Sequence, residues 1–149
     1  MIGVIGASFC GPDTAEKAYE IGKLLAQRGA ALVCGGLGGV MEAASKGASE
    51  AGGLVIGVLP GADTRGMNQY VRVPVITNMG HGRNVIIAHT AMGLVAVDGE
   101  YGTLSEIAVA LKLGKPVAAL GAWSGVKGVM PCATPGEAVE NVFNRLGLR

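Results

Sequence analysis

The sequence predicts an α/β fold of three layers, in which a doubly wound parallel sheet of about six or seven strands carries helices on both faces. Three observations support this fold class. Short apolar segments alternate with segments of helical periodicity along the chain, as in parallel strands joined by right-handed crossovers. Glycine provides 26 of the 149 residues and marks the turns between these segments. Charged residues provide only 15%, which is typical of strands buried on both faces.

The start of the chain predicts a strand followed by a helix. Residues 1–6 form a short apolar run that leads into a loop. Asp13 or Thr14 can cap a helix over residues 15–28, because apolar residues recur there at helical spacing. Gly29 then ends this helix.

The middle of the chain continues the alternation and then departs from it. We expect a strand at 31–34, an alanine-rich helix at 40–51 and a third strand at 54–59. Residues 61–73 show little periodicity, so we interpret them as a long loop, and such loops are often functional in a compact domain. A short strand at 75–77 follows.

The last part of the chain repeats the same pattern. The expected elements are a helix at 83–90, a strand at 93–97, a helix at 103–113, a strand at 116–120, an irregular stretch with room for a short strand at 128–130, and a helix capped by Thr134 that reaches residue 146. No linker, repeat or block of charge divides the chain. We therefore expect one Rossmann-like domain over residues 1–149 that binds a nucleotide or a phosphate.

Two glycine-rich loops carry most of the functional information. Gly35-Gly36-Leu37-Gly38-Gly39 follows the second predicted strand, and residues 98–103 follow the strand at 93–97. Glycine lets the backbone approach a ligand closely, and the helix start that comes next offers unpaired N–H groups to an anion. Carboxyl ends of parallel strands share one edge of the sheet. The two loops and the first loop, residues 6–13, should therefore converge on a nucleotide or phosphorylated cofactor.

Charge and composition argue against two classes of partner. The net charge is +1 and no run of Lys and Arg forms a basic stripe, which argues against nucleic acid. The first apolar run is too short for a signal peptide or a membrane span, so we expect no membrane partner. Low charge and the alanine-rich helices at 40–51 and 103–113 instead favour a homodimer or a higher homo-oligomer.

The cysteines and two missing motifs narrow the function further. Cys10, Cys34 and Cys132 are odd in number and widely spaced, which is typical of reduced cysteines in a cytoplasmic protein. No cluster of Cys and His predicts a metal site. The chain lacks the G-x-G-x-x-G dinucleotide fingerprint and the Walker A loop, so hydride transfer and NTP hydrolysis have little support.

One motif in the second half of the chain resembles that of a known family. Gly99-x-x-Gly102-Thr103-x-x-Glu106, with Arg83 twenty-three positions before the Glu, resembles the signature of the Lonely Guy (lysine-decarboxylase-like) family. There an Arg-Lys pair at a helix start precedes Pro-Gly-Gly-x-Gly-Thr-x-x-Glu. Residues 35–41 resemble the family's upstream glycine element. Residues 80–84 and 101–116 are similar to its short bacterial branch, which is related to molybdenum cofactor carrier proteins.

The resemblance implies roles for individual residues. Arg83 and Glu106 take the places of an Arg and a Glu implicated in cleaving a nucleoside 5′-monophosphate into base and ribose 5-phosphate. A carboxylate can stabilise the oxocarbenium-like ribose that such cleavage forms, and a guanidinium can hold phosphate oxygens. The candidate phosphate- or nucleotide-binding residues, taken from the three loops and from the resemblance, are Gly6, Ser8, Gly35, Gly36, Gly38, Gly39, Gly99, Tyr101, Gly102 and Thr103.

Two departures from the family pattern leave two function classes open. Asp98-Gly99-Glu100 stands where the family has Pro-Gly-Gly, and Asn84 replaces the Lys beside the Arg. Either Glu100 points away from the phosphate loop or the ligand differs from a simple monophosphate, because like charges repel. These changes favour a carrier of a phosphorylated cofactor, such as molybdenum cofactor, over a phosphoribohydrolase. No covalently bound cofactor is implied.

Overall fold

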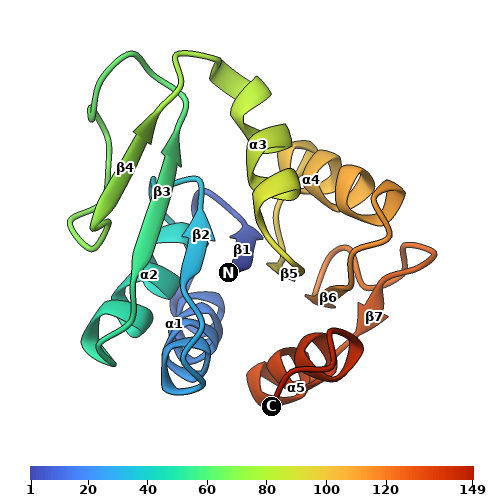
Figure 1. Ribbon diagram of the computed structural model, residues 1–149. Coiled ribbons are helices and arrows are strands. Elements are labelled where there is room, and N and C mark those ends of the chain that lie inside the picture. The colour runs from blue at the N-terminus through green and yellow to red at the C-terminus, as the bar shows by residue number, and fades with distance from the viewer.

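The computed structural model describes residues 1–149 and contains one seven-stranded sheet with helices on both faces (Figure 1). The strand order is β4-β3-β2-β1-β5-β6-β7, and every neighbouring pair is parallel. The strands are β1 (Ile2–Gly6), β2 (Leu32–Cys34), β3 (Val55–Leu59), β4 (Val73–Ile76), β5 (Leu94–Val97), β6 (Val117–Leu120) and β7 (Met130–Pro131). The predicted fold class is confirmed.

Four α-helices and one short 3₁₀ turn connect strands, and a fifth α-helix follows the last strand. They are α1 (Pro12–Gln27), α2 (Val40–Glu50), η1 (Gly80–Gly82), α3 (Arg83–Thr90), α4 (Tyr101–Lys112) and α5 (Pro135–Arg145). The chain runs outward from β1 to β4 and then returns to place β5 beside β1. This return reverses the strand order next to β1, and such reversals are where doubly wound sheets bind ligands.

Two apolar cores fill the spaces between the three layers. Alternation along a strand sends successive side chains to opposite faces: in β5, Val95 packs in the core beneath α1, α2 and α5, whereas Ala96 packs in the core beneath α3 and α4. All four residues of β5 are buried. Burial on both faces explains why the strands are continuous apolar runs and why charged residues are scarce. No helix is both long enough and apolar enough to cross a membrane.

Two helix starts differ from the sequence prediction. Helix α1 begins at Pro12 with Gly11 as its N-cap and no side-chain cap, so the prediction of an Asp13 or Thr14 cap is wrong. The Thr14 hydroxyl instead donates to the Asp98 carboxylate, 3.1 Å away. Helix α4 begins at Tyr101 rather than at residue 103. Strand β4 begins two residues before its predicted start, at Val73.

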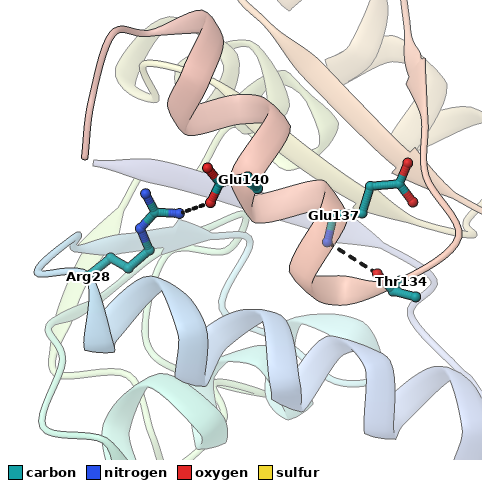
Figure 2. A network of polar contacts seen from close by, with 4 residues as sticks. All are labelled: Arg28, Thr134, Glu137 and Glu140. Carbon is teal, nitrogen blue, oxygen red and sulfur yellow. Dashed lines mark hydrogen bonds and ion pairs between the residues drawn. The ribbon is translucent and has the colours of Figure 1, made fainter.

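The last helix is capped as its sequence predicts and is tied to α1 by a charged contact. The Thr134 hydroxyl accepts a hydrogen bond from the backbone N–H of Glu137 (Figure 2). The Arg28 guanidinium, just after α1, pairs with the Glu140 carboxylate at 2.7 Å. Arg28 also lies 4.1 Å over the ring of Phe143, so one side chain joins two helices that are far apart in sequence.

Candidate ligand-binding cleft

A cleft of about 660 Å³ opens at the carboxyl ends of the central strands. It is lined by the loops after β1, β2 and β3 and by the first turns of α3 and α4. This is the edge of the sheet on which the sequence predicts a site, and its volume suits a small organic ligand. The predicted residues that line the cleft are Gly6, Ser8, Gly35, Arg83, Gly102, Thr103 and Glu106.

The other predicted residues lie outside the cleft wall. Gly39 lines a neighbouring cavity of about 430 Å³, which shares Ser8 with the cleft. Gly36 packs against Leu59. The residues not found in the lining of either cavity are Gly36, Gly38, Gly99 and Tyr101. Their contact with a ligand stays a prediction, as does that of the residues in the cleft.

The start of α4 supplies free backbone donors to the cleft. Glu100 is the N-cap, and no side chain caps the helix. The N–H groups of Tyr101, Gly102 and Thr103 therefore have no acceptor in the protein, and of these residues Gly102 and Thr103 line the cleft. The buried Thr103 hydroxyl also makes no hydrogen bond to the protein and lines the cleft. This arrangement, with the positive end of the helix dipole, suits an anion such as phosphate.

Arg83 is held rigidly at the back of the cleft. Its Nε donates to the Val58 carbonyl at 3.0 Å, and its Nη1 donates to the Asn84 amide oxygen. A Cβ at Gly35 would lie only 2.8 Å from Nη2, so the glycine after β2 leaves the room that the guanidinium occupies. Burial lowers the pKa of Arg83, and the nearby Glu106 opposes that shift.

Glu106 is a buried carboxyl group with no partner in the protein. Its side chain on α4 is 7% exposed and makes no hydrogen bond or ion pair. Burial raises the pKa of Glu106 from its ordinary value near 4.5 to about 8, although the Arg83 charge works in the opposite direction. At neutral pH most molecules therefore carry a protonated Glu106, which can donate a hydrogen bond to a ligand.

The two carboxylates just before α4, Asp98 and Glu100, have different environments. Asp98 accepts hydrogen bonds from the Thr14 hydroxyl and the Ala122 N–H, both at 3.1 Å, so the loop after β5 is joined to the first turn of α1 and to the loop after β6. Its φ of 50° is one that proline cannot adopt, so proline would not fit at position 98 in this conformation. Glu100 is exposed and lines the cleft. Both alternatives left by the sequence, a Glu100 that points away and a ligand other than a simple monophosphate, therefore stand.

The structure adds residues that sequence reasoning missed. Asn68, within the predicted long loop, is buried, and its amide donates to the Leu37 carbonyl while its backbone N–H donates to Gly36. It thus holds the glycine-rich loop after β2 in place. Phe9 is 95% exposed and lines both cavities. Phe9 could have been noticed in the sequence, because it is a bulky apolar residue in a loop of small residues. Nothing in the local sequence marks Asn68.

Comparisons with known proteins identify the family and confirm the fold. The model of the SLOG cluster4 family matches residues 1–143. An uncharacterised protein of Archaeoglobus fulgidus is 49% identical over 93% of this chain and 91% of its own length. The molybdenum cofactor binding protein of Rippkaea orientalis has a TM-score of 0.91 and 34% identity, over 97% of this chain and 96% of that one. The molybdenum cofactor carrier protein of Chlamydomonas reinhardtii has a TM-score of 0.90 and 38% identity, over 98% and 97%.

Proposed function

Because the chain belongs to the SLOG cluster4 family, and because its fold matches molybdenum cofactor carrier proteins, we propose that it binds a phosphorylated cofactor and carries it without turnover. Molybdenum cofactor is the foremost candidate cargo. One observation carries the proposal: the free N–H groups of α4 face a cleft whose wall also contains the buried, unpartnered Glu106 and Thr103.

The donors present suit the phosphate end of such a ligand. Backbone N–H groups at the start of α4, the Thr103 hydroxyl and the Arg83 guanidinium can each donate to phosphate oxygens. Phe9, Leu37 and Met41 line the same cleft and offer apolar surface to a flat ring system. The cleft thus offers hydrogen-bond donors to the phosphate end of the cargo and an apolar wall to its ring system. We assign no protein ligand to the metal of the cargo.

The alternative is a phosphoribohydrolase of the Lonely Guy type, and it rests on the presence of Arg83 and Glu106 in one cleft. Such a reaction uses a carboxylate to stabilise positive charge on the ribose. Since burial raises the pKa of Glu106 to about 8, the carboxylate is the minor form at neutral pH. This protonation state favours binding over cleavage.

Native mass spectrometry of freshly purified protein tests the proposal directly. We expect a co-purifying phosphorylated compound that denaturation releases unchanged. Incubation with AMP supplies the second arm: the carrier releases no adenine, whereas an enzyme releases adenine and loses that activity in the Glu106→Gln variant. A protein that binds no phosphorylated compound in either arm would contradict both functions.

A further inference from the structure

Asn84, the second residue of α3, occupies an unusual position in the cleft wall. Its side chain is 5% exposed, and its amide oxygen accepts a hydrogen bond from Arg83 Nη1. That bond fixes the orientation of the amide, because only the oxygen can accept from a guanidinium. The amide nitrogen, Nδ2, makes no hydrogen bond to the protein, although Asn84 is nearly buried.

The free amide nitrogen lies beside the start of α4. Nδ2 is 3.6 Å from the point that a Cβ at Gly102 would occupy. The unpaired N–H groups of the first turn of α4 are therefore its neighbours. Nδ2 is open to the cleft, because Trp123 Nε1 is the only fully enclosed side-chain nitrogen or oxygen that lacks a hydrogen-bond partner. Donors without a protein partner that come from two different helices and open onto one cleft can share a single acceptor.

We propose that Asn84 holds Arg83 in position through its amide oxygen and donates through Nδ2 to the phosphate at the start of α4. This inference rests on the proposed function and deepens it. A lysine at position 84, as in the resembled family, would add a positive charge but would offer Arg83 no acceptor. At this position the phosphate is therefore bound by a neutral amide N–H of Asn84 rather than by a positive charge. A neutral donor of fixed direction suits the reversible binding of a phosphate monoester.

Isothermal titration with inorganic phosphate and with AMP tests the donor role. Asn84→Asp keeps the shape and the acceptor for Arg83 but replaces the donor by a carboxylate oxygen. We expect it to bind both probes roughly ten- to a hundredfold more weakly than the wild type, as for loss of a hydrogen bond to a charged group. Asn84→Ala, which removes both contacts, should bind the two probes no more tightly than Asn84→Asp does.

A matched control and a second measurement keep the outcomes distinct. Asn141→Asp makes the same chemical change on α5, where Asn141 contacts Cys132, and it should leave the affinity for phosphate unchanged. In ¹⁵N-labelled wild-type protein, the side-chain amide signals of Asn84 should shift on addition of phosphate, which needs no variant to fold.

A result against the role of Asn84 can be told apart from a result against the proposed function. Wild-type affinity in folded Asn84→Asp, or unmoved Asn84 amide signals while other cleft signals shift, would overturn the role of Asn84 and leave the proposed function standing. A wild type that binds neither probe and carries no phosphorylated compound would instead count against the proposed function.

Discussion

Burial acts on Glu106 and Arg83 in the same sense, since it favours the neutral form of each group. It raises the pKa of the carboxyl and lowers that of the guanidinium, and each charge opposes the shift of the other. Of these two groups, only the Glu106 carboxyl has a pKa that burial moves into the physiological range. Glu106 is therefore the residue through which pH acts most directly on this cleft.

We predict that Glu106 makes the protein less stable as the pH rises. The pKa of Glu106 is about 8 in the folded protein and near 4.5 when unfolded, so the folded state binds more protons between these values. The stabilisation is complete below pH 4.5 and is lost as the pH rises through 8, by at most about 1.4 kcal/mol per pH unit. Glu106→Gln, which cannot ionise, should remove this slope.

Chemical denaturation of both proteins between pH 5 and 9 measures this effect. The two free energies of unfolding should lie close together at pH 5 and diverge in favour of the Gln variant towards pH 9. Parallel pH profiles would show that Glu106 keeps an ordinary pKa. The same ionisation adds a negative charge beside the phosphate site, so the affinity for AMP should fall across the same range.

A second prediction at this scale concerns Gly35. A Cβ there would lie 2.7 Å from Met41 Sδ and 2.8 Å from Arg83 Nη2. Gly35→Ala should therefore displace the guanidinium and weaken AMP binding by roughly tenfold or more, the contribution of a charge-assisted hydrogen bond. Gly125→Ala, in the loop between β6 and β7, adds a Cβ that meets nothing within 4 Å and lies outside the cleft lining, so it serves as the control. Equal affinities of the two variants in titration calorimetry would show that Arg83 does not need this space.

At the scale of elements, α1 and α2 pack against each other at backbone distance. Gly22 of α1 lies against the carbonyl of Ala44, and Gly47 of α2 lies against the carbonyl of Tyr19. Any side chain at either position would overlap a backbone atom. These two glycines let the helices approach at backbone distance, which in turn sets the start of α2 beside the cavity that Gly39 lines.

Gly22→Ala should therefore destabilise the fold, although alanine is the better helix former. Helix propensity alone would stabilise the variant by about 1 kcal/mol, but the added Cβ must push α1 away from α2, and overpacking of this kind costs about 1–3 kcal/mol. Thermal denaturation should show a lower Tm. Gly136→Ala in α5, where a Cβ meets nothing within 4 Å, should keep or raise the Tm, and a rise in both variants would contradict the packing argument.

Element order was predictable because it depends on local patterns, whereas several details depend on distant residues. Apolar runs and glycine stops place β2, β5 and their helices, and the carboxyl-edge rule brings Gly35 and Gly102 into one cleft. The Thr14 hydroxyl was predicted as a cap but bonds to Asp98, 84 residues away. Asn68 and the pairing of Asn84 with Arg83 likewise follow from tertiary contacts, which no local pattern encodes.

At the scale of the whole molecule, the two helical layers differ in their outer surfaces. The sequence favours α2 and α4 as partner-facing helices. The outer side of α2 exposes Glu42, Lys46 and Glu50, which does not suit an apolar interface. The layer of α3 and α4 instead exposes Val85 and Leu113. We therefore propose a homodimer that uses α3 and α4, the two-fold arrangement being the commonest among oligomers.

Light scattering after size exclusion tests this assembly. The wild type should have about twice the chain mass of 14.9 kDa. Val85→Lys places a charge in the proposed interface and should shift the mass to that of one chain. Leu54→Lys is the control, because Leu54 is 44% exposed, much like Val85 at 46%, but lies outside that layer. A monomeric wild type, or a dimer that persists in Val85→Lys, would rule out this interface, since a buried unpaired lysine is too costly to keep.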